Sequence, residues 1–218
     1  MKRPVLTFVA LFLLSGCAAA PAAYQGKDYS REAPVRLNLA AVLVDTEYQS
    51  PGTAPNIEQE MQPSPEDRLR MAISQHYPVL RANRARAAEL RFIIKEASVT
   101  KTTLPQPEAW LDRVTSDKPE FHYDGRLVIE ASASGPGTRR AGFIHAEASR
   151  SLEVGHLSPA ERERHVQGMS AQMVDDVMAQ IDQQLNEHLG GFVYGDGSND
   201  TSVTPQPSGR WDRVMEWK

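Results

Sequence analysis

Apolar and polar residues alternate along much of the chain, and this alternation predicts β-strands. The clearest case is the stretch 121–134, where apolar side chains at odd positions face polar ones at even positions. Such a strand has one buried face and one solvated face. The stretch 141–154 shows the same alternation after the turn sequence Gly135-Pro136-Gly137. We therefore expect these two strands to form an antiparallel hairpin.

Two further strands are predicted earlier in the chain. The stretch 35–48 has apolar residues on both faces, which is typical of a strand in the interior of a sheet. The stretch 89–103 places Leu90, Phe92 and Ile94 on one face. Together with the hairpin, these stretches give four strands.

Two stretches repeat apolar residues at steps of three and four, as a helix with one apolar face does. The first begins at Ser64, which suits a helix cap, and ends before Pro78. The second begins at Ser158 and runs to about Leu189, before two glycines. Each helix has one apolar stripe, so both should cover the same face of the sheet. The order β-α-β-β-β-α thus predicts an α+β fold, a two-layer sandwich of a four-stranded sheet and two helices.

The segments that flank this domain, predicted as 34–194, have a different composition. Residues 17–33 are rich in Ala, Pro, Gln and Gly without apolar periodicity, which is typical of a tether. Residues 195–218 begin with Gly, Ser, Asn, Asp, Thr and Pro, and we expect disorder there. Residues 1–16 form a leader.

The leader has the three parts of a secretory signal peptide. Lys2 and Arg3 are basic, an apolar run of about ten residues follows, and small residues precede Cys17. An apolar helix of that length rises only about 15 Å, half of a bilayer core, so it is too short to span a membrane.

The sequence Leu14-Ser15-Gly16-Cys17 resembles the lipobox of bacterial lipoproteins. This resemblance implies a lipid on the Cys17 thiol, cleavage before this residue and acylation of the new amino terminus. The alternative is an ordinary signal peptide that happens to contain a cysteine.

The residue after the cysteine bears on which membrane holds the protein. An Asp at this position would resemble an inner-membrane retention signal, and the chain has Ala18 instead. The expected location is therefore the outer membrane, facing the periplasm.

Charge and cysteine content exclude several classes of function. The net charge is −4, and it becomes −6 without the leader, which has two basic residues and no acidic ones. A mildly acidic chain is not attracted to nucleic acid or to anionic headgroups, so a lipid has to supply the membrane attachment. Cys17 is the only cysteine, which excludes an internal disulfide and a thiolate-metal site.

Catalytic and metal-binding patterns are not found in the sequence. The six histidines are scattered, without the spacing of a metal site. The one alternative is a site on the outward faces of the hairpin, from His122, Asp124, His145 and Glu147; we interpret these residues as part of a solvated sheet face. No catalytic residue, cofactor or metal is therefore predicted, and we expect a protein that is not an enzyme.

The end of the chain carries an unusual aromatic segment with Trp211, Val214 and Trp217. A docking peptide for a partner protein is one interpretation, and a tail that folds back on its own domain is the other.

The lipobox, the size and the order of elements resemble those of small envelope lipoproteins: the auxiliary lipoproteins of ABC-type transport systems and the lipopolysaccharide-assembly lipoprotein. This resemblance implies a non-enzymatic accessory or scaffold of an envelope transport or assembly complex. Two alternatives are a hydrolase that acts on envelope polymers and a carrier that holds a hydrophobic ligand between helices and sheet.

Overall fold

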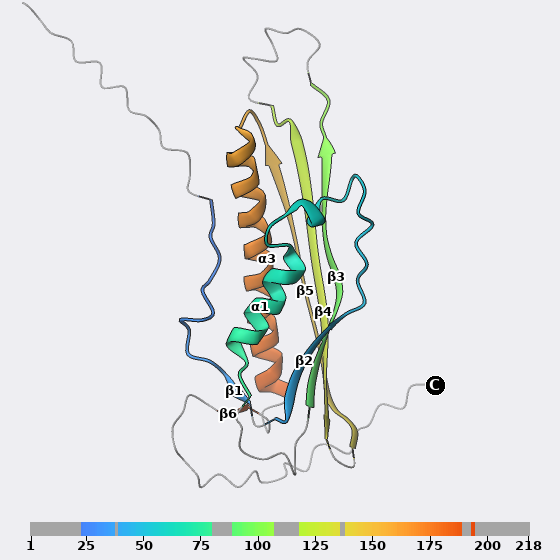
Figure 1. Cartoon of the computed structure of the whole chain (residues 1–218), viewed down its shortest axis with the longest axis vertical. Coiled ribbons are helices and arrows are strands. Elements are labelled where there is room, and N and C mark those ends of the chain that lie inside the picture. Colours follow the sequence, from blue (N-terminus) through green and yellow to red (C-terminus); the bar gives the residue numbers. More distant parts are fainter. Residues whose placement is uncertain are drawn as a thin grey trace, which may run out of the picture.

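The computed structural model describes residues 23–37, 39–79, 89–106, 118–135, 138–188 and 193–194. A four-stranded sheet and two helices make up its two layers (Figure 1). The strands lie in the order β2 (Ala41–Thr46), β3 (Glu89–Thr103), β4 (Phe121–Gly135) and β5 (Thr138–Val154). The helices α1 (Pro65–His76) and α3 (Pro159–His188) pack on one face of the sheet. The predicted α+β fold and its element order are confirmed.

The sheet is mixed. β2 and β3 are parallel, and the chain between them passes through α1. β3, β4 and β5 form an antiparallel meander in which Ile94, Ile129 and Ala146 lie side by side on neighbouring strands. The predicted hairpin of the last two strands is thus present.

The core fills the space between the inner face of the sheet and α3. On β4, Leu127 and Ile129 are at most 1% exposed, as their alternation predicted. Met173 of α3 is fully buried and lies over Gly125 of β4. A β-carbon at Gly125 would come within 2.6 Å of the Met173 methyl group, so the missing side chain leaves room for Met173 against the sheet.

A β-bulge changes the inward-facing positions of β3. Phe92 and Ile94 are buried, and further along the strand Ala97 and Val99 are buried instead, so the inner face moves from even to odd positions. The register against β4 shifts between Ile94 and Glu96, which accounts for the change.

The first predicted strand, 35–48, is wrong as a single element. β1 (Arg36–Leu37) pairs with β6 (Val193–Tyr194) in a separate two-stranded sheet, the chain bends at residues 39–40, and only then does β2 begin. Leu37 is buried before the bend, and Val42 packs against the core after it. The bend turns the opposite face of the chain inward, which is why both faces of this stretch are apolar.

Each of the two helices begins directly after a serine that caps it. The Ser64 hydroxyl accepts the Asp67 N–H at 3.1 Å, and the Ser158 hydroxyl accepts the Glu161 N–H at 3.3 Å. A short 3-10 helix, η1 (Glu58–Glu60), lies between β2 and α1. None of the described helices is both long and apolar enough to cross a membrane.

Candidate functional site

The described part of the predicted tether, residues 23–33, runs along α3. Two tyrosines and one backbone amide of this segment converge on a single carboxylate, that of Asp175. The Tyr24 and Tyr29 hydroxyls donate to it, and the Lys27 N–H donates at 3.1 Å. Tyr29 is only 5% exposed and belongs to the core. This part of the segment is therefore docked on the domain.

Two glycines allow the segment to lie close against α3. Gly168 has no side chain where the Tyr24 carbonyl passes, and a β-carbon there would come within 2.8 Å of that oxygen. Gly26 has φ of +80° and lies against Ala171. A positive φ is a conformation that glycine adopts at little cost. Backbone contacts thus add to the hydrogen bonds at Asp175.

The hydrogen bonds also fix the protonation state of both tyrosines. The bond to Asp175, together with partial burial, raises the pKa of Tyr24 to about 12. Burial and the same carboxylate raise the pKa of Tyr29 even further. Both hydroxyls therefore remain neutral donors at physiological pH.

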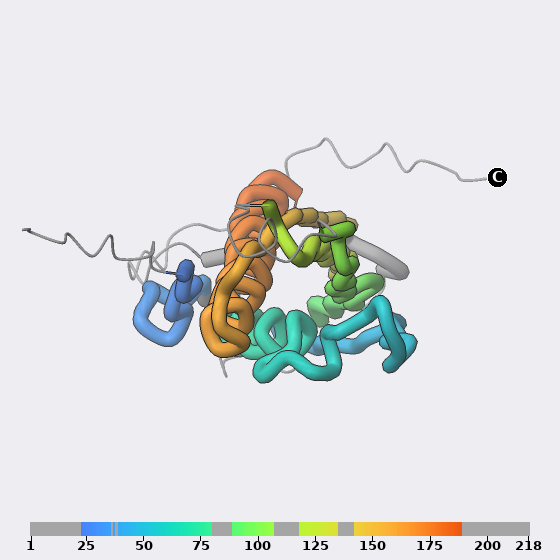
Figure 2. Tube along the Cα trace, turned by 90° about the horizontal axis from the view of Figure 1, so that it is seen from above, coloured from blue at the N-terminus to red at the C-terminus, as the bar shows by residue number. Residues whose placement is uncertain are grey.

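The docked segment lies on the side of α3 that faces away from the sheet (Figure 2). Met173 contacts the sheet, and Asp175 follows two residues later, about 200° around the helix axis. Cys17 is outside the described residues. Seven residue steps separate it from Tyr24, which span at most about 25 Å. The described segment therefore leads toward Cys17 from the helix side of the domain.

A second carboxylate on α3 holds the end of α1. Asp182 follows Asp175 by seven residues, so it lies on the same side of α3 two turns further on. It accepts the Tyr77 hydroxyl at 2.7 Å and lies 3.2 Å from the His76 Nε2. Burial, together with Asp182, raises the pKa of Tyr77. The side of α3 opposite the sheet therefore carries two polar attachment points in sequence.

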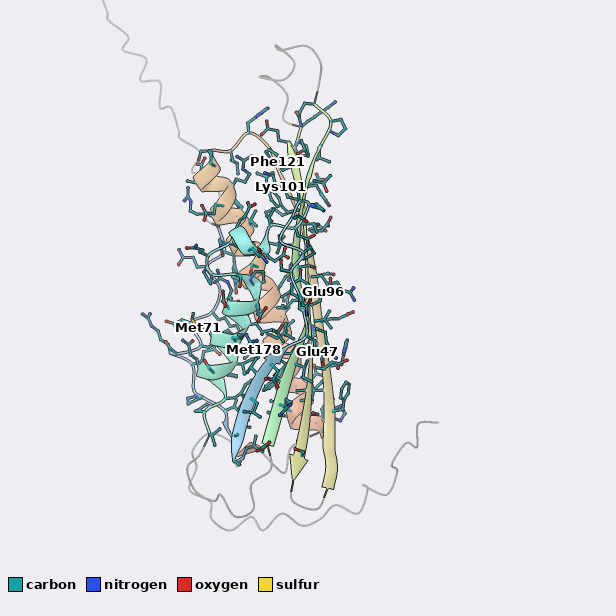
Figure 3. The ribbon with its side chains drawn as sticks, turned by 45° about the vertical axis from the view of Figure 1, so that its right-hand side comes forward. Glu47, Met71, Glu96, Lys101, Phe121 and Met178 are labelled. Carbon is teal, nitrogen blue, oxygen red and sulfur yellow. The ribbon has the colours of Figure 1, made fainter. Side chains whose placement is uncertain are left out.

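The outer face of the sheet is not covered by the described helices, which both lie on the other face (Figure 1). Its charged side chains form ion pairs across neighbouring strands, for example Lys95 with Glu47 at 2.6 Å and Arg126 with Glu96 at 3.3 Å. Figure 3 shows Glu96 on the side away from the helices. Among the described side chains that form ion pairs on this face, seven are carboxylates and three are Lys or Arg: Asp45, Glu47, Glu96, Asp124, Glu130, Glu147 and Glu153 with Arg91, Lys95 and Arg126. The described, ion-paired part of the face therefore carries an excess of carboxylates.

The outer face also exposes one large apolar side chain. Phe143 on β5 is 51% exposed, on a strand whose inward residues Ile144 and Ala146 are buried. Aromatic side chains are enriched at protein–protein interfaces relative to the rest of the surface, which makes Phe143 a candidate contact residue. Met71, which is 52% exposed, lies on the helix side instead, on α1 (Figure 3).

The structure separates the four residues considered as a catalytic or metal site. His122 pairs with Asp124 at 3.0 Å, and His145 lies 4.0 Å from Glu147. His145 is opposite Glu130 on β4, eight residues from His122, which corresponds to about 27 Å along the strand. The two histidines therefore do not share a site. Within the described ranges, no group of three or more metal-ligating side chains is arranged around a common point.

The hollows at the surface of the described part include the following three. One of about 580 Å³ is lined mainly by polar groups, including Tyr48, Ser50 and Glu58. A second of about 300 Å³ lies beside the docked segment near Arg68. A third of about 260 Å³ lies at the N-terminal end of α3. The largest of these three is polar, so it does not suit the hydrophobic-ligand carrier considered from the sequence.

Sequence reasoning missed the attachment at Asp175. The available signal was two tyrosines, Tyr24 and Tyr29, in a stretch otherwise poor in apolar residues. Asp175 lies outside the predicted apolar stripe of the long helix, so its position in the sequence gave no signal. The predicted partner-binding residues Trp211, Val214 and Trp217 lie outside the described residues, so their role stays a prediction.

One family model matches the chain: the prokaryotic membrane lipoprotein lipid attachment site, over residues 1–18. The chain is therefore a bacterial lipoprotein. A lipid on Cys17, its one cysteine, anchors it to a membrane. No curated protein matches the sequence.

Solved structures with a similar arrangement include a minor lipoprotein from Acinetobacter baumannii, with 13% identity, a TM-score of 0.38 and coverage of 69% of this chain and 93% of that one. The uncharacterised lipoprotein B from Nitrosomonas europaea has 16% identity and a TM-score of 0.41, with coverage of 73% and 94%. A putative neuraminyllactose-binding hemagglutinin homolog from Helicobacter pylori has 11% identity and a TM-score of 0.41, with coverage of 74% and 91%.

Proposed function

We propose that this lipoprotein is a non-enzymatic accessory or scaffold of an envelope transport or assembly complex, held at the outer membrane and facing the periplasm. It presents the outer face of its sheet to a partner protein. Ala18 after the lipidated cysteine supports the choice of membrane.

The observation that carries this proposal is the placement of the anchor. The segment that leads to Cys17 is attached to α3 at Asp175, on the side opposite the sheet. The chain therefore leaves the described domain toward Cys17 on the helix side, with a reach of at most about 25 Å from Tyr24. This exit favours an orientation with the helix side toward the membrane and the outer sheet face free for a partner.

The chemistry of the outer face supports protein binding rather than catalysis. Its carboxylates are distributed in cross-strand ion pairs along the strands instead of converging on one point. The exposed ring of Phe143 supplies an apolar contact, and the excess of carboxylates suits a partner surface with Lys or Arg. The hydrolase alternative would need the His122 and His145 pairs in one cleft, and they are about 27 Å apart.

Crosslinking in cells followed by affinity purification tests the proposal. Phe143→Ala should lower recovery of an envelope partner, because it removes the exposed ring without touching the core. Met71→Ala is the matched control, because this side chain is equally exposed on the helix side. Equal recovery with both variants, or a loss with Met71→Ala alone, would show that the outer sheet face is not the binding surface.

Fractionation tests the anchor separately. Cys17→Ser should release the domain into the soluble fraction, because no lipid then holds it on the membrane. A variant that remains in the membrane fraction would show that another part of the chain binds the membrane.

A further inference from the structure

The hollow of about 260 Å³ lies where η1, the N-terminal turns of α3 and the inner face of β3 and β4 meet. Its apolar lining comes from Ile57, Met61 and Val166. The volume is just below the range of about 300–1,000 Å³ that holds drug-sized ligands. A small molecule or a headgroup therefore fits, and an entire lipid does not.

Two cations line this pocket without a carboxylate partner. The Lys101 Nζ lies 4.4 Å from the centroid of the Phe121 ring, and the guanidinium carbon of Arg162 lies 4.5 Å from the same centroid (Figure 3 labels Lys101 and Phe121). The ring positions both cations but does not neutralise them. In the described part of the chain, neither has a carboxylate oxygen within 4.0 Å.

Two carboxylates line the same pocket, those of Glu60 and Glu163. They too have no cationic nitrogen within 4.0 Å among the described residues. Most other charged side chains of the described domain form ion pairs or hydrogen bonds. The pocket thus holds two positive and two negative groups that are kept apart from one another.

Two further donors line the pocket. The Tyr123 side chain is 2% exposed, and its hydroxyl makes no hydrogen bond to a described residue. Burial raises its pKa, so the hydroxyl remains protonated. Gln167 also lines the hollow, and its buried Nε2 has no hydrogen-bond partner among the described residues. A buried polar group without a partner is costly, and a ligand acceptor would remove that cost.

We propose that this pocket binds a small zwitterion with an apolar group. The anionic group lies against Lys101, Arg162 and the Tyr123 hydroxyl, and the ammonium group lies against Glu60 and Glu163. The apolar group packs on Ile57, Met61 and Val166. A zwitterion matches both pairs of charges, whereas a pure anion or cation leaves one pair unmatched. An apolar amino acid has all three groups. The headgroup of an ethanolamine phospholipid has the two charges, and the first carbons of the adjoining chains supply the apolar group.

Calorimetric titration of the lipidated full-length protein in detergent micelles tests the proposal. The ligands are leucine, N-acetylleucine, which lacks the ammonium group, and leucinamide, which lacks the carboxylate. We expect leucine to bind and each derivative to bind about tenfold more weakly, since each loses one set of charge-assisted contacts. A parallel titration uses micelles doped with short-chain phosphatidylethanolamine or phosphatidylglycerol. Binding of the ethanolamine lipid alone would support the zwitterion site and assign it to a headgroup.

Variants locate the binding in this pocket. Arg162→Gln and Glu163→Gln should each weaken binding about tenfold, while Arg164→Gln, on the same helix but outside the pocket, should not. Circular dichroism checks that each variant is folded. Lys101→Met removes the second positive charge of the pocket, which lies on the sheet and not on the helix. The proposal is overturned if neither leucine nor the ethanolamine lipid binds, if the derivatives bind as well as leucine, or if Arg162→Gln and Lys101→Met leave binding unchanged.

Discussion

The side-chain amide of Gln184 pairs with the backbone of His145 as a neighbouring strand would. Its Nε2 donates to the His145 carbonyl at 2.6 Å, and its Oε1 accepts the His145 N–H at 3.1 Å. One turn earlier, Gln180 makes the same two bonds to Glu147, at 2.7 Å and 3.2 Å. The match works because four residues of helix rise about 6 Å and two residues of strand rise about 6.8 Å. Two glutamines of α3 thus cap the free edge of β5 at His145 and Glu147.

Removing both amides should expose that edge. In Gln180→Ala/Gln184→Ala, four backbone hydrogen bonds of β5 lose their partners, at about 0.5–1.5 kcal/mol each where water does not replace them. We expect a lower free energy of unfolding in urea and concentration-dependent self-association in sedimentation velocity, because unpaired strand edges pair with other chains. Gln183→Ala is the control, because its side chain bonds only Glu187 on the helix surface. A double variant as stable and monomeric as this control would contradict the edge-capping role.

Asp175 should hold the N-terminal segment in place. Asp175→Ala removes the acceptor for Tyr24, Tyr29 and the Lys27 N–H, and it leaves the buried Tyr29 hydroxyl unpaired, at a cost of about 1–3 kcal/mol. Hydrogen exchange in residues 24–31 should become faster while β4 and β5 remain protected. Asp176→Ala, which removes only an exposed ion pair with Arg150, serves as the comparison. Unchanged protection of the segment in Asp175→Ala would mean that other contacts hold it.

The same attachment should fail in strong alkali. The pKa of Tyr24 is raised from about 10 to about 12 in the folded chain. A raised pKa means that the stabilisation is complete below about pH 10 and is lost as the pH rises through about 12. Tyrosinate absorbance and proteolysis of the segment should therefore change together in this range. In Tyr24→Phe the segment should already be more susceptible to proteases at neutral pH, and a pH profile identical to that of the wild type would refute the role of this hydroxyl.

Glu58 should make the fold sensitive to acid. This carboxylate is 4% exposed and accepts hydrogen bonds from Ser50 and from Tyr48, the latter at 2.7 Å. Burial alone would raise its pKa, but these hydrogen bonds outweigh burial and lower the pKa below the ordinary 4.5. Its stabilisation is therefore complete above about pH 4.5 and is lost as the pH falls through the folded-state pKa.

Urea unfolding between about pH 6 and pH 3 measures this effect. At about pH 6, Glu58→Gln should be less stable than the wild type by about 1–2 kcal/mol. It should also lose less stability than the wild type on acidification. Glu89→Gln changes an exposed carboxylate at the start of β3 and should follow the wild type. If Glu58→Gln loses as much stability on acidification as the wild type does, other groups cause the acid sensitivity.

The sequence determined which stretches form strands and helices, and it located the lipid attachment site. β3, β4, β5 and α3 lie where the periods of two and of three to four residues placed them, because these patterns follow from local geometry and from one buried face. The lipobox is a linear motif and needs no fold to be found. The bend between Leu39 and Ala41 was missed. Apolar residues on both faces are expected for a central strand, and they are also expected for a chain that turns its opposite face inward after a bend.

Only the tertiary structure decided which surfaces are free and which are covered. The bond from Tyr24 to Asp175 joins residues 151 positions apart, and those from Gln180 and Gln184 join helix side chains to strand backbone. Such contacts leave no periodic trace in a sequence, because they depend on how whole elements pack and on where single polar groups find partners. The docking of the anchor segment, the capped edge of β5 and the pocket at Lys101 and Arg162 therefore emerged only once the layers were assembled.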